Sequence, residues 1–142
     1  MSAEALAGLK AYWEGLTRER VGILDTVYAP EASFRDPFNE VRGVEELRRV
    51  FERMYETLES PRFTISETIL QEDRAVLVWD FDFRIKAFQP ARERRIHGVS
   101  LVRFAPDGRV VEHRDYWDAA GELYSKLPVL GPLMRLLAKR MG

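Results

Sequence analysis

The sequence predicts a single α+β domain over residues 1–142, in which helices come first and long strands follow. Three observations support this fold class. Apolar residues recur at helical spacing before Pro61, and they alternate with polar residues after it. The chain has 142 residues and a hydrophobic share of 46%, which suits one compact core. We therefore expect a curved antiparallel sheet whose concave face is covered by the N-terminal helices and encloses a pocket.

Three helices are predicted in the N-terminal part of the chain. The first, over residues 3–16, is indicated by four apolar residues at helical spacing: Leu6, Leu9, Trp13 and Leu16. Thr17 is the predicted N-cap of a second, short helix, which carries apolar residues as far as Tyr28 and ends at Pro30. The most regular helical spacing in the chain predicts the third helix, over residues 44–58.

After Pro61 the spacing of apolar residues changes to two, which predicts four strands joined by tight turns. The predicted strands are residues 63–70, 74–87, 92–104 and 109–117. The sequence Pro106-Asp107-Gly108 is a strong turn signal before the last of them. From about residue 119 a C-terminal tail is helical in character but interrupted at Pro128 and Pro132.

Composition narrows the class of function. The 22 basic and 23 acidic residues nearly balance, so no overall positive field favours nucleic acid. The chain has no cysteine, which excludes disulfides, thiol catalysis and thiolate metal ligands and fits a reducing cytoplasm. Its first residues lack the pattern of a signal peptide, and no apolar run is long enough to span a bilayer. We expect a cytoplasmic protein that does not associate with membranes.

Asp36 is the first candidate catalytic residue. It ends a short predicted strand directly before Pro37 and lies between Phe34 and Phe38. A residue before proline is pushed toward extended backbone geometry, which restricts the position of its side chain. A carboxylate held beside aromatic rings is partly desolvated and suited to act as a general base. The alternative is that Asp36 solvates the strand end or caps a turn.

The last predicted strand supplies a second polar cluster. Alternation places Val111, His113, Asp115 and Trp117 on one face, so that an inward Val111 and Trp117 would bring His113 and Asp115 inward too. This pair would face Asp36 under aromatic cover. The alternative is a buried histidine with satisfied hydrogen bonds and an aspartate that pairs with a nearby arginine.

His97 is a weaker candidate, because alternation places it on the face opposite Ser100. It would turn inward only if Gly98 marked a β-bulge. A metal site would need Asp36, His113 and Asp115 to converge, and the sequence contains no close-spaced ligand motif. Glycine-rich phosphate loops are missing as well. We therefore predict neither a metal nor a cofactor.

The order of elements and the residues around Asp36 resemble the nuclear-transport-factor-2-like (NTF2-like) superfamily of cone-shaped α+β domains. Within it, the chain is similar to the ketosteroid isomerase and SnoaL-like polyketide cyclase branch. Tyr12 and Asp36 are separated by 36 − 12 = 24 positions, as are the oxyanion-hole tyrosine and the general-base aspartate of the isomerases. The sequence from Gly43 to Arg48 resembles the start of the next helix of that family.

The resemblance implies roles for several residues. Asp36 would be the general base and Tyr12 an oxyanion donor. Ser100 stands where the isomerases have a protonated aspartate, and serine is a weaker donor, so steroid isomerisation itself does not follow. His113 and Asp115 resemble a histidine and an aspartate that cyclase-like members carry on the same strand. Homodimerisation is common in these families, and we expect it here.

The leading hypothesis is a cofactor-independent enzyme, of isomerase, cyclase or hydrolase type, that acts by acid–base chemistry. Its substrate would be a small apolar molecule with a carbonyl or hydroxyl group. The predicted pocket walls are Trp13, Phe34, Phe38, Trp79, Phe81, Ser100 and Trp117. One alternative is a non-catalytic domain that binds a hydrophobic ligand, and another is an interaction module using the outer sheet face around Asp80 and Asp82. The apolar tail would be a lid, a dimer contact, a membrane-surface contact or a helix packed on the core.

Overall fold

The structure is a computed structural model that describes residues 2–122 and 130–141. Its helical elements are α1 (Ser2–Glu14), the 3-10 helix η1 (Glu19–Thr26), α2 (Val44–Thr57), α3 (Ala119–Glu122) and α4 (Leu130–Met141). Its strands are β1 (Tyr28–Arg35), β2 (Glu40–Arg42), β3 (Leu58–Gln71), β4 (Arg74–Ile85), β5 (Arg94–Phe104) and β6 (Val110–Trp117). They form one six-stranded sheet in the order β2-β1-β6-β5-β4-β3.

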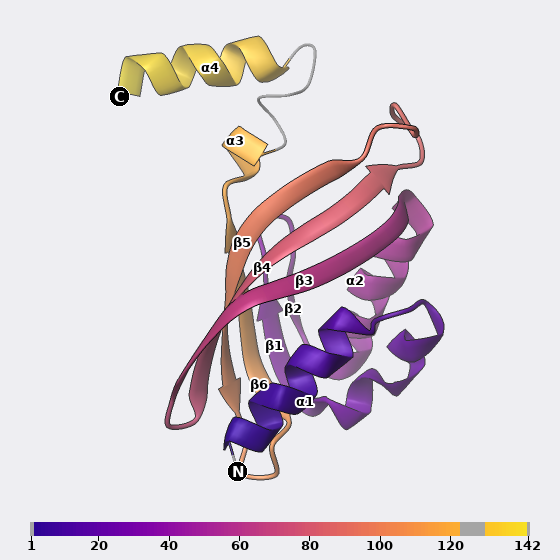
Figure 1. Cartoon of the computed structure of the whole chain (residues 1–142), viewed down its shortest axis with the longest axis vertical. Helices are drawn as coiled ribbons and strands as arrows, with labels where there is room; N and C mark the ends of the chain where they lie inside the picture. The colour runs from indigo at the N-terminus through magenta and orange to yellow at the C-terminus, as the bar shows by residue number, and fades with distance from the viewer. Residues whose placement is uncertain (1, 123–129, 142) are drawn as a thin grey trace.

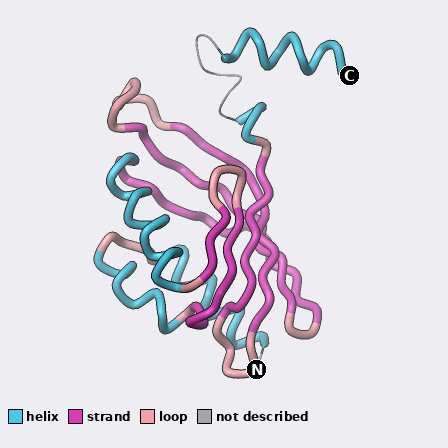
Figure 2. The backbone as a smooth tube through the Cα atoms, turned by 180° about the vertical axis from the view of Figure 1, so that it is seen from behind, coloured by secondary structure: helices cyan, strands magenta, loops and turns pink. Residues whose placement is uncertain are grey.

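The predicted α+β fold class is confirmed. The long strands β3, β4 and β5 curve across the molecule, and α1, η1 and α2 lie together on one side of the sheet (Figure 1). In the view from behind, most of these helices lie at the left of the strands, and part of the helical chain passes behind the sheet (Figure 2). Helix α1 contacts β3, and α2 contacts both β1 and β3. The helices therefore bridge the two edges of the curved sheet.

One pairing differs from the predicted antiparallel sheet. Strands β1 and β6 are parallel, whereas the other four pairs are antiparallel. A parallel pair needs a long connection, and here the connection contains α2 and the hairpins of β3, β4 and β5. The short strand β2 was not predicted, and it pairs with the end of β1 just past the turn at Asp36.

Two prolines lie inside strands, which corrects the predicted boundaries. The 3-10 helix ends at Thr26, so Pro30 belongs to β1 and does not end a helix. Pro61 lies within β3, which begins before it. In both places the strand register shifts, and a proline without an N–H group is tolerated where ladder pairing is interrupted.

The core fills the space between the helices and the concave face. Leu9, Leu24, Leu47 and Leu77 are almost fully buried there. At the start of β6 it is Val110, and not Val111, that is fully buried, so Val111 does not share the buried face of His113 as alternation had placed it. The β5–β6 register shifts at this point, so β6 carries one extra residue and its alternation changes phase.

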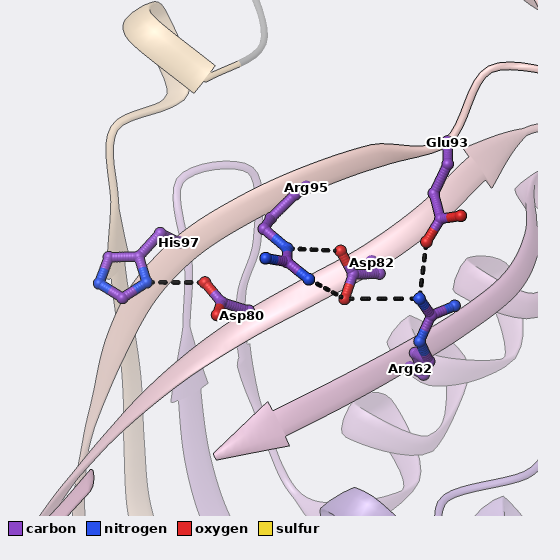
Figure 3. A network of polar contacts seen from close by, with 6 residues as sticks. All are labelled: Arg62, Asp80, Asp82, Glu93, Arg95 and His97. Carbon is purple, nitrogen blue, oxygen red and sulfur yellow. Dashed lines mark hydrogen bonds and ion pairs between the residues drawn. The ribbon is translucent and has the colours of Figure 1, made fainter. Parts of the chain in front are cut away.

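The outer face of β4 and β5 carries a line of ion pairs (Figure 3). His97 binds Asp80 there, with 2.8 Å between Nδ1 and Oδ1. His97 therefore lies opposite Ser100, as alternation predicted, and the β4–β5 register is unbroken at Gly98. Glycine is required at position 98 for a different reason. A Cβ atom there would lie 2.7 Å from the Trp79 ring and 3.0 Å from the Trp117 Cβ.

Asp82 lies in the same line of ion pairs but is only 3% exposed. Its carboxylate accepts two hydrogen bonds from Arg95, at 2.7 and 3.2 Å, and lies 3.8 Å from Arg62. Arg62 in turn pairs with Glu93 (Figure 3). The two arginines cover Asp82 and neutralise its charge within this part of the outer face.

The C-terminal tail is described in part, since residues 123–129 lie outside the described residues. Helix α4 stands away from the sheet in both views (Figures 1 and 2). Its Leu133, Leu136 and Leu137 are about half exposed. The packing of these leucines on the core, one of the alternatives from sequence, is therefore not seen. None of the described helices has the length and apolar character needed to cross a bilayer.

Candidate active site

A cavity of about 450 Å³ lies between α2 and the concave face of the sheet. Aromatic and aliphatic side chains make most of its wall, with a few polar groups among them. Seven of the predicted site residues line it: Phe34, Asp36, Phe38, Trp79, Phe81, Asp115 and Trp117. A second cavity of about 20 Å³ is lined by Trp13, Phe51, Phe63, Ser100, His113 and Asp115. Asp115 lines both cavities and therefore lies where they meet.

The parallel pairing of β1 with β6 brings the two predicted aspartates together. Arg35 lies opposite Arg114 in this pair. The residue after each of these arginines is an aspartate: Asp36 directly follows β1, and Asp115 lies within β6. Both carboxylates contribute to the cavity wall. Neighbouring residues of a parallel pair share one face of the sheet, so the strand order supplies the convergence that the sequence analysis expected.

Asp36 holds the turn that connects β1 to β2. Its Oδ1 atom accepts hydrogen bonds from the backbone N–H groups of Phe38, at 2.8 Å, and Asn39, at 2.6 Å. The side-chain amide of Asn39 lies 3.1 Å from Oδ1 and 3.2 Å from Oδ2. This is the turn-capping arrangement that was the alternative for Asp36. Its carboxylate nevertheless remains part of the cavity wall.

Asp115 is held differently, through one of its two oxygens. Oδ1 lies 2.6 Å from Nε2 of His113 and accepts a short hydrogen bond from the hydroxyl of Ser100. Ser100 is fully buried and accepts a hydrogen bond of 2.9 Å from the indole N–H of Trp79. Among the described residues, no donor reaches Oδ2 of Asp115. One oxygen of Asp115 is therefore fixed by the protein, and the other is not.

The hydrogen bonds on the other side of His113 fix its tautomer. Tyr28 lies 2.8 Å from Nδ1, and its hydroxyl oxygen accepts a bond of 3.2 Å from the indole N–H of Trp13. The Tyr28 proton then has one acceptor within the described structure, the Nδ1 atom of His113. Nδ1 is thus an acceptor, and Nε2 carries the proton that it donates to Asp115. With this assignment, every donor in the series of hydrogen bonds from Trp13 through Tyr28 and His113 to Asp115 has an acceptor.

Aromatic rings enclose His113, which is only 5% exposed. Trp13 stacks on its ring with 4.9 Å between centroids, and Phe34 meets it edge-on at 4.8 Å. Tyr28 is fully buried beside it, and this burial raises the pKa of the Tyr28 phenol well above its ordinary value. The phenol therefore stays protonated and remains a donor to Nδ1.

Tyr12, the predicted oxyanion donor, is placed away from this cluster. Its hydroxyl donates a hydrogen bond of 2.7 Å to the backbone carbonyl of Arg20, whose guanidinium lies over the Tyr12 ring. Burial raises the pKa of this phenol above its ordinary value. Tyr12 lines neither of the two cavities. The spacing between Tyr12 and Asp36 thus does not bring the two side chains to one cavity in this structure.

The sequence analysis missed several residues of the site, and three of them are informative. Tyr28 was assigned to the apolar side of a short helix, but it begins β1 and binds His113. Asn39 supports Asp36, and an aspartate followed by Pro and then Asn three positions on is a turn signal that was available. Phe63 lines both cavities, and alternation alone gave no reason to prefer it to its neighbours.

No three histidine or acidic side chains converge on a possible metal position within the described part of the chain. The chemistry of the cluster is that of proton transfer. An aspartate with one free oxygen faces an apolar cavity, and a histidine of fixed tautomer supports it. A carboxylate in such surroundings accepts or donates a proton at a defined point on a bound molecule.

The curved mixed sheet, the helices on its concave face and the cavity between them define an NTF2-like α+β domain. The chain belongs to the SnoaL-like domain family, which matches residues 9–113. No curated protein sequence matches it.

Solved structures share the fold. An LEH-like epoxide hydrolase from M. tuberculosis has 17% sequence identity and a TM-score of 0.72, with 97% of this chain and 98% of that one covered. A protein with a ketosteroid isomerase-like fold from Catenulispora acidiphila has 18% identity and a TM-score of 0.71, with coverages of 87% and 92%. A proposed SnoaL-like polyketide cyclase from Jannaschia sp. CCS1 has 16% identity and a TM-score of 0.70, with coverages of 84% and 87%. At these identities the likeness is one of fold alone.

Proposed function

We propose that the protein is a cofactor-independent enzyme that carries out acid–base chemistry on a small apolar molecule bearing a carbonyl or hydroxyl group. Asp115 is the general base, and it acts through Oδ2. The observation that supports this most directly is the asymmetric bonding of its carboxylate. His113 and Ser100 hold Oδ1, whereas Oδ2 has no donor within the described structure and its residue lines the cavity.

The reaction begins with transfer of a substrate or water proton to Oδ2 of Asp115. The two donors on Oδ1 stabilise the ionised carboxylate before the transfer and keep its orientation. The Tyr28–His113 bond prevents rotation of the imidazole and maintains the Nε2–H tautomer. Return of the proton to a second position of the same molecule gives isomerisation. In cyclisation the deprotonated carbon attacks a carbonyl of the same molecule, and the proton returns to the new alkoxide. In hydrolysis the deprotonated water attacks the substrate, a carbon–oxygen bond breaks, and the proton passes from Asp115 to the leaving oxygen.

Asp36 is the second acid–base group of this proposal. It lies beside Asp115 and lines the same cavity, but both of its oxygens already accept hydrogen bonds from the turn. We therefore assign the first proton transfer to Asp115 and reserve for Asp36 a hydrogen bond to the polar group of the substrate. A role for Tyr12 as an oxyanion donor would require its bond to the Arg20 carbonyl to break.

The substrate class follows from the wall of the cavity. Phe81, Phe83, Ile85 and Ile96 continue the apolar surface away from Asp115. A molecule with an apolar body and one polar group would bury the body there and direct the polar group to the aspartates. Enones, lactones and unsaturated alcohols have this form. We also infer a cytoplasmic location, which the lack of cysteine favours.

The proposal is tested by turnover of a panel of enones, lactones and unsaturated alcohols with the wild type and three variants. Asp115→Asn keeps the shape of the side chain and removes the base, so turnover should fall by about 10²–10⁴-fold. Turnover by Asp36→Asn should fall less than turnover by Asp115→Asn. Asp80→Asn is the matched control, since it makes the same change on the outer face and should leave the rate unchanged.

Binding of a neutral fluorescent apolar dye to the cavity is measured in parallel. All variants should bind it equally, because the apolar wall is intact. Full turnover by Asp115→Asn would overturn the assignment of the base. Dye binding without turnover of any compound by the wild type would favour the alternative, a non-catalytic domain for a hydrophobic ligand.

A further inference from the structure

A groove of about 430 Å³ on the outer face of the sheet collects charged side chains from β1, β2, β4, β5 and β6. These strands are neighbours in the sheet (Figure 1). The charged residues of the groove are Arg35, Arg42, Arg74, Arg103, Arg114, Glu40 and Glu112. Five arginines against two glutamates leave an excess of three positive charges, on a chain whose net charge is −1.

The groove and the candidate active site lie on opposite faces. Along β6, His113 is buried on the inner face, so its neighbours Glu112 and Arg114 project to the outer face, where both are exposed. Phe34 and His113 also contribute to the lining of the groove, but the His113 ring binds Tyr28 and Asp115. The arginines of the groove are not part of that cluster, so its occupancy can be measured through them.

The strand register places arginines directly beside one another. Arg35 lies opposite Arg114 in the β1–β6 pair, and Arg74 lies opposite Arg103 in the β4–β5 pair. Like charges at directly opposed positions destabilise a sheet. The same register places Arg35 opposite Glu40 and Arg103 opposite Glu112, so the two pairs are compensated only in part and a further anion would stabilise them.

The protein itself neutralises only part of this charge, through Glu40 and Glu112. Arg103 pairs with Glu112 at 3.0 Å, and this bond lowers the pKa of the glutamate. Arg114 lies over the ring of Tyr116 at 4.7 Å, without an acidic partner among the described residues. Arg35 and Arg74 likewise have no ion pair within the described part of the chain. The contrast is with Arg62 and Arg95 further along the sheet, which both have carboxylate partners (Figure 3).

We propose that this groove binds the phosphate or diphosphate group of a small organic phosphate. The guanidinium group offers paired N–H donors that match phosphate oxygens, and two arginine pairs require more than one negative charge. A single carboxylate would leave most of the excess unneutralised. Exposed Leu101 and Tyr116 line the groove beside Arg114 and provide apolar surface for the organic part of the ligand.

The same charges disfavour a second copy of the chain as the occupant. In a two-fold symmetric contact a surface patch meets itself, so a contact centred on this groove would oppose arginines to arginines. An anionic small molecule has the complementary charge.

Isothermal titration with inorganic pyrophosphate tests the proposal, with sodium chloride added to matched ionic strength as the blank. The wild type should bind, and the affinity should fall as salt is raised, because the groove is open to solvent. The double variant Arg35→Gln/Arg114→Gln should bind about tenfold more weakly or worse, since it removes one charged pair. Arg92→Gln, at an exposed arginine in the β4–β5 turn, removes one positive charge outside the groove and should bind like the wild type.

Thermal unfolding supplies a second measurement. Pyrophosphate should raise the Tm of the wild type and of Arg92→Gln but not that of the double variant, which by itself should be no less stable than the wild type because a like-charge pair is gone. Equal binding by wild type and double variant would overturn the proposal, as would equal loss in Arg92→Gln or no binding at all. A double variant that also changed its sedimentation would identify the groove as a contact between copies, and this too would overturn it.

Discussion

At the scale of single residues, the two oxygens of Asp115 have different surroundings. Oδ1 is committed to His113 and Ser100, and both partners are themselves held by buried indole or phenol groups. Buried polar networks of this kind are rigid when every member is satisfied. The geometry at Oδ2 is therefore set before any ligand arrives, which is the arrangement that a general base requires.

Tyr55 is the opposite case, since its buried hydroxyl has no hydrogen-bond partner among the described residues. Burial raises its pKa from 10.0 to about 12. Tyr55→Phe removes the unpaired hydroxyl, so the free energy of unfolding at pH 7 should rise by about 1 kcal/mol, as measured by urea titration. A clear fall in stability would show that the hydroxyl is satisfied in solution.

The raised pKa of Tyr55 also predicts a pH dependence. A phenol whose folded pKa exceeds its unfolded pKa stabilises the fold fully below pH 10, and this contribution is lost between pH 10 and about 12. Tyr28 has a raised pKa too, so it adds to the same alkaline loss. Urea titrations from pH 8 to 11.5 should show a shallower decline for Tyr55→Phe than for the wild type. Equal slopes would contradict the assignment.

At the scale of elements, β4, β5 and β6 meet in a row where Gly98 lies between Trp79 and Trp117. Gly98→Ala would put a methyl group 2.7 Å from the Trp79 ring. Overpacking of this kind should lower the free energy of unfolding by about 1–3 kcal/mol and change the tryptophan emission.

Gly8→Ala is the matched control for Gly98→Ala. Gly8 is exposed in α1, and a Cβ there meets nothing within 4 Å, so its replacement should raise stability by about 0.5–1 kcal/mol. Opposite signs for the two substitutions are the expected result. A stable Gly98→Ala with unchanged emission would show that the tryptophans are free to move aside.

The ion pairs on the outer face allow a comparison of burial (Figure 3). The Asp82 side chain is 4% exposed, whereas the Asp80 side chain is 27% exposed and its partner His97 59%. Asp82→Asn should therefore lower the free energy of unfolding by about 1–2 kcal/mol, and Asp80→Asn by less than about 0.5 kcal/mol. Urea titration at two salt concentrations measures both. Equal costs would mean that solvent screens the buried pair as well.

At the scale of the whole molecule, the predicted homodimer is still a prediction. Helix α4 offers a specific contact, since Leu133, Leu136 and Leu137 are about half exposed and Met141 is largely exposed. Sedimentation of the full chain should give twice the 16.5-kDa chain mass, and a chain ending at residue 122 should be monomeric with unchanged unfolding. A truncated chain that still dimerised would direct attention to the outer sheet face.

Most of the fold was open to prediction because it is encoded locally. The spacing of apolar residues placed α1, α2 and the last four strands close to their observed bounds, except that β3 begins five residues before its predicted start. Alternation placed His113, Asp115 and Trp117 on the inner face correctly, and it failed at Val110 because a bulge changes the phase of β6. Two prolines misled the prediction because register shifts admit them into strands.

The candidate site likewise has features that the local sequence determines and features that depend on long-range contacts. The sequence by itself determined an α+β chain with a constrained Asp36, an inward pair at His113 and Asp115, and an apolar wall, since each follows from a residue and its near neighbours. Only the tertiary structure decided that β1 runs parallel to β6, that Tyr28 and not Tyr12 reaches the histidine, and that five arginines share one outer groove. These are contacts between segments up to 85 positions apart, and strand order and register fix them where local periodicity carries no information.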